Sequence, residues 1–135
     1  RTSDAFNIEA VYLCGITAKP PHREIQKTAL GATESIEWEY FETTEQALDK
    51  LKKKEFLIYA IEQTENPIYL QELTYNFEKI ALVFGNEVDG VGQNVINLSK
   101  NSIEIPQFGT KHSFNVSISY GIVLWHIVIQ TLKKL

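Results

Sequence analysis

Two short, uninterrupted apolar runs constrain the fold of this chain most strongly. Residues 56–61 read Phe-Leu-Ile-Tyr-Ala-Ile, and residues 80–84 read Ile-Ala-Leu-Val-Phe. A strand with one solvent-exposed face alternates apolar with polar side chains. Neither run shows this alternation. Continuous apolar strands are typical of parallel sheets, because helices cover both faces of such sheets. We therefore expect both runs to be buried strands of a parallel sheet.

Strand and helix patterns alternate along most of the chain. The capping-box spacing of Thr43 and Gln46 predicts one helix start, and Pro106 ends a short strand because proline has no N–H for the sheet ladder. Such alternation predicts an α/β fold with a mostly parallel sheet flanked by helices. Ligands of such sheets bind at the carboxyl ends of the strands. Further strands are expected at 10–15, 37–41 and 102–105, and further helices at 24–30, 93–98 and 115–132.

Composition and length limit the class of protein. A chain of 135 residues suits one domain, and 44% hydrophobic with 22% charged residues is typical of a soluble globular protein. A formal net charge of −4 gives no global positive field for nucleic acid, so any RNA contact must come from local groups. The single Cys14 cannot form an internal disulfide, which fits a cytoplasmic location. His22, His112 and His126 stand apart in the sequence, and we expect no metal site.

The segment 115–132 is predicted to be a helix that is apolar on nearly every side, and such a helix must be buried. Polar residues, His126 and Gln130 among them, interrupt the pattern, so we expect a buried or interface helix and no membrane contact. Ser113 and Asn115 precede the helix, where side-chain oxygens cap free backbone N–H groups. On spacing alone, capping is the simpler interpretation of both residues.

Two segments that leave predicted strands carry the functional signal. The first contains Phe84, Gly85, Asn86 and Glu87, with Gly90. The second contains Ile105 and Pro106, then Ser113, Phe114, Asn115 and Val116. In this order and spacing the two segments resemble the second and third motifs of the SpoU/TrmH-type RNA 2′-O-ribose methyltransferases of the SPOUT superfamily. The resemblance extends over essentially the whole chain.

The start of the chain resembles the end of that family's first motif. In the family an arginine precedes residues like Thr-Ala-Asp-Ala, and this chain begins Arg1-Thr-Ser-Asp-Ala. The family's upstream asparagine and the strand before it are absent, and the chain contains no methionine. We therefore expect residues 1–135 to be a single SpoU-type methyltransferase domain that lacks its natural N-terminal start.

The resemblance implies a C-terminal deep trefoil knot, a homodimer formed through the C-terminal helix, and methyl transfer from S-adenosyl-L-methionine to a ribose 2′-hydroxyl of RNA. It implies that Arg1 activates or orients the hydroxyl, and that Glu87, Ser113 and Asn115 arrange the site. Main-chain groups of Gly85, Ile105 and Phe114 would hold the adenosine, although the family usually has leucine at the last position. The implied cofactor-binding positions are Phe84, Gly85, Asn86, Ile105, Phe114 and Asn115.

The substrate and the activity have alternatives. Ribose methylation of tRNA is the leading hypothesis, because residues 61–66 resemble those of relatives that modify tRNA guanosines. Ribosomal RNA is the alternative substrate, and a catalytically idle RNA-binding homologue with the same fold is the alternative function. A nucleotide-binding Rossmann enzyme is disfavoured, since Gly85, Gly90 and Gly92 miss the Gly-x-Gly-x-x-Gly spacing.

Overall fold

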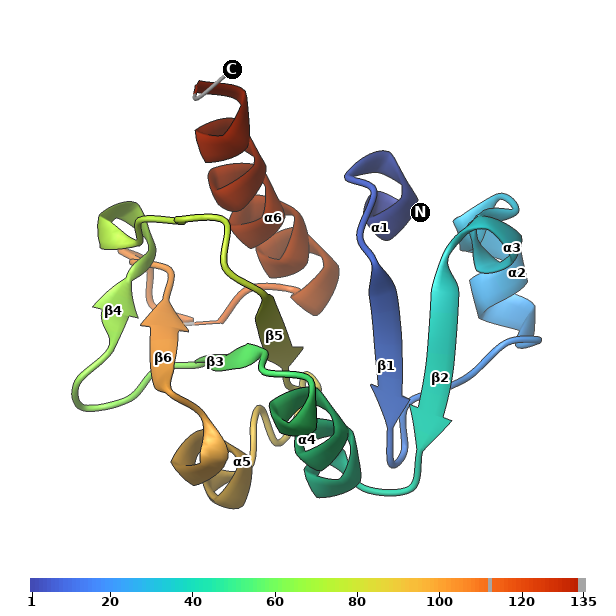
Figure 1. Ribbon diagram of the computed structural model, residues 1–135, viewed down its shortest axis with the longest axis horizontal. Coiled ribbons are helices and arrows are strands. Elements are labelled where there is room, and N and C mark those ends of the chain that lie inside the picture. Colours follow the sequence, from blue (N-terminus) through green and yellow to red (C-terminus); the bar gives the residue numbers. More distant parts are fainter. Residues whose placement is uncertain (112, 134–135) are drawn as a thin grey trace. The chain divides into compact units, whose positions relative to one another are not determined.

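The computed structural model describes residues 1–111 and 113–133, and the chain divides into two compact units, Arg1–Lys50 and Leu51–Leu135. Strands and helices alternate in both units, as predicted (Figure 1). The first unit contains α1 (Thr2–Ala5), β1 (Ala10–Cys14), α2 (Arg23–Ala29), α3 (Ala32–Ser35) and β2 (Glu37–Phe41). Helix α4 (Thr44–Lys53) begins in the first unit and ends in the second. The second unit also contains β3 (Leu57–Ile61), β4 (Ile68–Tyr69), the 3₁₀ turn η1 (Leu70–Glu72), β5 (Ile80–Phe84), α5 (Gln93–Leu98), β6 (Asn101–Glu104) and α6 (Val116–Lys133).

The first unit is built on a two-stranded parallel sheet. Strand β1 pairs in register with β2 along the whole length of both strands, and α2 and α3 form the connection between them. Helix α4 follows β2 and begins at the predicted capping box. The backbone N–H of Thr43 donates to Oε1 of Gln46, and the backbone N–H of Gln46 donates to Oγ1 of Thr43, both at 3.3 Å. The two bonds satisfy donors that a helix start leaves free.

The second unit contains a four-stranded parallel sheet with the strand order β4-β6-β3-β5. The two apolar runs form its neighbouring strands β3 and β5, with Leu57 opposite Ile80 and Ile61 opposite Phe84. The prediction of parallel pairing is therefore confirmed within each unit. The short strand β4 and the turn η1 were not predicted from the sequence, because two or three residues show no periodicity.

The core of the second unit lies between its sheet and α6. Tyr59, Leu70, Ile103, Val123 and Ile127 form one buried cluster, contributed by β3, η1, β6 and α6. Ile103 and Val123 are 0% exposed, and burying a side chain of this kind contributes about 1.5–3 kcal/mol. This packing fixes α6 on the sheet, and with it the loop that precedes the helix.

One face of α6 stays outside this core. Ile118, Ile122, Trp125 and Leu132 are between 37% and 55% exposed. Within a single chain α6 is therefore buried on one side only, and the interface helix that the sequence offers as an alternative stays a prediction. By length and composition α6 would also suffice to cross a membrane, a property that core helices of soluble proteins share.

Polar residues of α6 bind a neighbouring loop. Nε2 of Gln130 donates to the backbone oxygen of Leu73 at 3.1 Å, and Oε1 of Gln130 accepts from the backbone N–H of Tyr75 at 2.8 Å. Nε2 of His126 lies 3.0 Å from the same Leu73 oxygen. The residues that interrupt the apolar pattern thus satisfy backbone groups of the 73–75 segment.

Candidate active site

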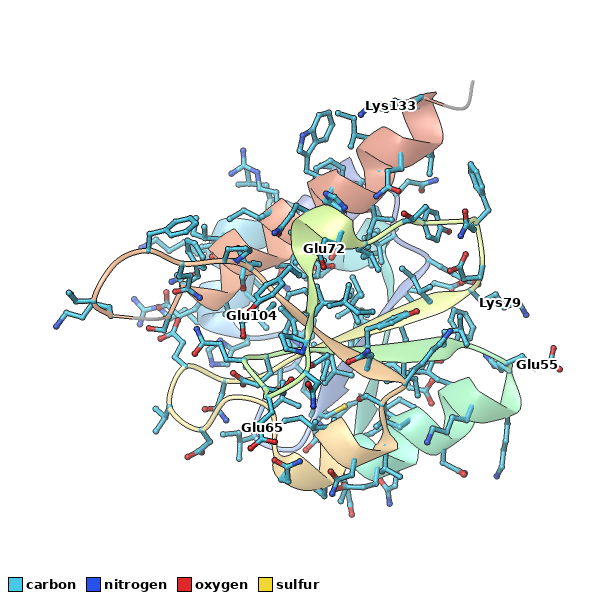
Figure 2. The ribbon with its side chains drawn as sticks, turned by 90° about the vertical axis from the view of Figure 1, so that its left-hand side faces the viewer. Glu55, Glu65, Glu72, Lys79, Glu104 and Lys133 are labelled. Atoms are coloured by element: carbon cyan, nitrogen blue, oxygen red, sulfur yellow. The ribbon has the colours of Figure 1, made fainter. Side chains whose placement is uncertain are left out.

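The carboxyl ends of the strands in the second unit meet at one edge of the sheet. Figure 2 shows Glu65 and Glu104, which follow β3 and end β6, on the opposite side from Glu55 and Lys79, which precede β3 and β5. A cavity of about 530 Å³ at this edge is lined by Gln63, Thr64, Glu65, Glu104 and Gln107. A second cavity of about 310 Å³ is lined by Pro106, Gln107, Phe108, Gly109, Thr110, Lys111, Ser113 and Phe114. Both cavities are formed by loops that leave strands, where such sheets bind ligands.

The loop after β5 is a tight turn closed by its own hydrogen bonds. Oδ1 of Asn86 accepts from the backbone N–H groups of Val88 and Asp89 at 2.9 and 2.6 Å. The backbone N–H of Gly90 donates to the backbone oxygen of Asn86 at 3.0 Å. A Cβ on Gly85 would lie 2.0 Å from the carbonyl carbon of Gly90, so no side chain fits at that position. The predicted cofactor residues Gly85 and Asn86 therefore shape the loop, Asn86 through its side-chain oxygen.

Glu62 fastens this loop to the end of β3. Its Oε2 accepts a hydrogen bond from the backbone N–H of Val91 at 2.9 Å, and its Oε1 accepts from the backbone N–H of Gln63 at 3.0 Å. A Cβ on Gly90 would lie 2.4 Å from Glu62 Oε2. The lack of a side chain at Gly90 therefore leaves room for the Glu62 carboxylate. Sequence reasoning missed Glu62, although its position directly after a buried strand was an available signal.

Asn115 connects the two predicted motifs. Its Nδ2 donates to Oε1 of Glu87 at 3.4 Å. Its Oδ1 accepts from the backbone N–H of Ser117 at 2.9 Å and from the Ser117 hydroxyl at 2.6 Å. The predicted cap at the start of α6 is therefore confirmed for Asn115, and the other side of the same amide contacts a residue of the β5 loop. Both Asn115 and Glu87 are exposed, so the amide and the carboxylate are accessible to a ligand.

The remaining predicted residues of the second unit divide between the cavity and the core. Ser113 and Phe114 line the smaller cavity. Ile105 packs against the buried cluster, and the ring of Phe84 meets the ring of Tyr120 edge-on at a centroid distance of 5.1 Å. The side chains of Ile105 and Phe84 thus support the core.

Arg1 belongs to the first unit, where it is the N-cap residue of α1 and is exposed. Its association with Glu87, Ser113 and Asn115 stays a prediction. Within residues 1–111 and 113–133, no group of three or more His, Cys, Asp or Glu side chains is placed to hold a metal ion. His112 lies outside the described residues.

Sequence and structure comparisons lead to the same group of proteins. The profile of the SpoU rRNA Methylase family matches residues 1–125. A tRNA (guanosine(18)-2′-O)-methyltransferase of Borreliella burgdorferi is 27% identical over 99% of this chain and 60% of its own length. A 23S rRNA (guanosine-2′-O-)-methyltransferase of Neisseria meningitidis is 30% identical over 92% of this chain and 49% of its own length. The solved TrmH/SpoU tRNA modifying enzyme of Aquifex aeolicus gives a TM-score of 0.85 at 27% identity, over 98% of this chain and 66% of that chain.

The extent of these matches bears on the site. This chain spans 60% and 49% of the two curated relatives. The matched residues 1–125 include every residue predicted for the site, from Arg1 to Asn115. The likeness to the Aquifex aeolicus structure also extends over nearly the whole chain.

Proposed function

This chain belongs to the SpoU rRNA Methylase family, and from that premise we propose that it transfers a methyl group from S-adenosyl-L-methionine to a ribose 2′-hydroxyl of RNA. The observation that carries the proposal is the hydrogen bond between Asn115 and Glu87. It joins the two motif loops at the carboxyl edge of a parallel sheet, where such folds bind ligands. Both neighbouring cavities are formed by residues of these strand ends and loops.

The chemistry requires position more than a strong base. The bond between the methyl carbon and the sulfonium sulfur breaks, a bond to the ribose oxygen forms, and the hydroxyl proton leaves. Holding the carbon and oxygen about 3–3.5 Å apart and in line supplies much of the rate enhancement. The donor carries the reactive sulfonium, so the protein supplies binding, orientation and a site for the proton.

We assign the roles accordingly. Main-chain groups of Gly85, Ile105 and Phe114 hold the adenosine, and the packing of the Ile105 side chain in the core supports a main-chain role for that residue. Phe84, Asn86 and Asn115 complete the cofactor site through the shape of their loops. Glu87, Ser113 and Asn115 arrange the ribose, because their side chains are exposed. Arg1 orients the hydroxyl or binds the phosphate of the target nucleotide. Either role suits a guanidinium better than removing a proton does.

The exposed face of α6 supports a proposal about the assembly. Ile118, Ile122, Trp125 and Leu132 leave a row of apolar side chains in water, and a second copy of the same helix would cover them. We include in the proposal a homodimer through α6, one SpoU-type domain made of both units, and the deep trefoil knot near its C-terminus. The single free thiol of Cys14 supports a cytoplasmic location.

Transfer RNA is the proposed substrate and ribosomal RNA the alternative. Residues 61–66 resemble those of tRNA-modifying relatives, and the Borreliella relative is named as a tRNA methyltransferase. The Neisseria relative is named as a 23S rRNA methyltransferase, which supports ribosomal RNA as the alternative substrate. Methylation of unmodified tRNA and of ribosomal subunits, with labelled methyl donor, tests the choice. Label confined to ribosomal RNA would contradict the tRNA proposal.

Calorimetry distinguishes the active enzyme from a catalytically idle RNA-binding homologue. An active enzyme should bind S-adenosylhomocysteine measurably, since the product occupies the donor site. A protein that binds RNA but gives no heat with S-adenosylhomocysteine would support the idle homologue instead.

A further inference from the structure

Phe108 is the most exposed of the large hydrophobic residues in the part of the chain that the structure describes. Its side chain is 96% exposed, and that of Phe114 on the same loop is 41% exposed. Both residues line the cavity of about 310 Å³. A phenyl ring in water favours an occupant that buries it, and ligand sites of roughly 300–1,000 Å³ suit small molecules or parts of larger ones. The cavity lies at the small end of this range.

The polar residues around Phe108 distinguish the kind of occupant. Thr110 and Lys111 line the same cavity, so the aromatic rings are accompanied by a cation and a hydroxyl. Cores of protein interfaces are depleted of lysine. Sites for unpaired nucleic acid combine aromatic rings, on which bases stack, with cations that attract the phosphates. The exposed face of α6 lacks this mixture and suits a protein partner.

The loop that carries Phe108 also carries the proposed reaction site. Ser113 lines the Phe108 cavity, and Asn115 two residues later binds Glu87. The base is bonded to the ribose that reacts, so it must occupy space next to these residues. An unpaired base of a folded RNA can be splayed out of its stack, and an aromatic side chain stabilises it there.

We propose that this cavity receives the base of an unpaired nucleotide of the substrate RNA, with the base stacked on Phe108 and Lys111 facing a phosphate. The inference rests on the proposed function and specifies how the same site takes its substrate. It makes Phe108 a substrate-binding residue, whereas the S-adenosylmethionine site uses main-chain groups.

The test compares ring removal with ring retention. Phe108→Leu keeps an apolar side chain without an aromatic face, and Phe108→Tyr keeps the face. Phe77→Leu is the matched control, because Phe77 is 55% exposed on a different loop of the same unit. The probes are a hairpin RNA with an unpaired loop and a fully paired duplex of the same length. Binding is measured by fluorescence anisotropy, S-adenosylhomocysteine affinity by calorimetry, and molar mass by light scattering.

We expect Phe108→Leu to weaken hairpin binding by about tenfold, within the range that loss of base stacking gives, with unchanged duplex binding. Phe108→Tyr and Phe77→Leu should bind the hairpin like the wild type, and no variant should change S-adenosylhomocysteine affinity or molar mass. The inference is overturned if Phe108→Leu behaves like Phe77→Leu, if it weakens S-adenosylhomocysteine binding, or if it changes the molar mass because Phe108 covers a second copy. Methyl transfer by the wild-type protein tests the proposed function separately, since hairpin binding reports on the cavity with or without turnover.

Discussion

Asn115 donates a hydrogen bond from Nδ2 to Oε1 of Glu87 at 3.4 Å, and these two residues, 28 positions apart in the chain, connect the two motifs. The orientation of the amide follows from its partners. The Glu87 carboxylate only accepts, and the Ser117 N–H that binds Asn115 Oδ1 only donates. Capping and motif connection are therefore two uses of one side chain, on opposite atoms.

This division makes Asn115→Asp informative. The aspartate keeps the oxygen that caps α6, so the melting temperature should barely change. It replaces the donor that faces Glu87 with a second carboxylate oxygen, and single-turnover methyl transfer should slow by at least about tenfold, or about 1.4 kcal/mol. Asn115→Ser is the control, because serine also caps but adds no charge. An unchanged rate with unchanged stability would leave Asn115 with the capping role alone.

Glu62 should position the loop after β5. Glu62→Ala leaves the part-buried N–H of Val91 without its acceptor, at a cost of about 1–3 kcal/mol. We expect a lower free energy of unfolding and weaker S-adenosylhomocysteine binding, measured by chemical denaturation and calorimetry. Glu62→Gln keeps an acceptor oxygen and should recover most of both. If Glu62→Ala behaves like Glu72→Ala, a change at an exposed position, Glu62 has no positioning role.

Helix α6 offers a matched pair of positions for testing the dimer. Ile122 is 37% exposed and Val123 is 0% exposed. Ile122→Glu should leave the fold intact and yield a monomer by light scattering, because it puts a charge only into the helix contact. Val123→Glu should unfold the protein, since that charge would enter the core. A stable dimer of Ile122→Glu would contradict assembly through this face.

Cys14 gives a prediction about reactivity. Burial raises the pKa of its thiol above the usual value, an effect that the Thr44 side chain partly opposes. The thiolate is the reactive form, so at a given pH a raised pKa leaves less of it. Alkylation by iodoacetamide near neutral pH should be slower than for a free cysteine peptide and should reach the peptide's rate in denaturant. Equal rates for the folded protein and the peptide would contradict this assignment.

The sequence predicts the elements whose signals are local. The apolar runs became β3 and β5, and the capping box at Thr43 and Gln46 forms both of its hydrogen bonds. The two motifs were expected at one edge of the sheet, and the Asn115 contact with Glu87 places them there. These features depend on periodicity, on capping chemistry and on the rule that parallel strands share a carboxyl edge.

Features that depend on distant contacts could not be predicted. The position of Glu62 directly after a buried strand indicates the ligand edge of the sheet, but its partner is a backbone N–H 29 residues away, which no local pattern identifies. Which side chains of α6 stay exposed depends on what the sheet and η1 cover, so the apolar pattern alone cannot identify the exposed face. Strand β4 forms because Ile68 and Tyr69 pair with Ile103 and Glu104 of β6. A strand of two residues has no periodicity, so the sequence alone does not predict it.

The most direct test of the central claim is methyl transfer itself. The protein is incubated with S-adenosyl-L-methionine labelled in the methyl group and with unmodified tRNA, and the RNA is then digested to nucleosides. We predict label in a 2′-O-methylated nucleoside, no label in any base, and labelling at least about tenfold slower with Asn115→Asp. Measurable S-adenosylhomocysteine binding without label in tRNA or ribosomal RNA, or label on a base, would contradict a ribose 2′-O-methyltransferase.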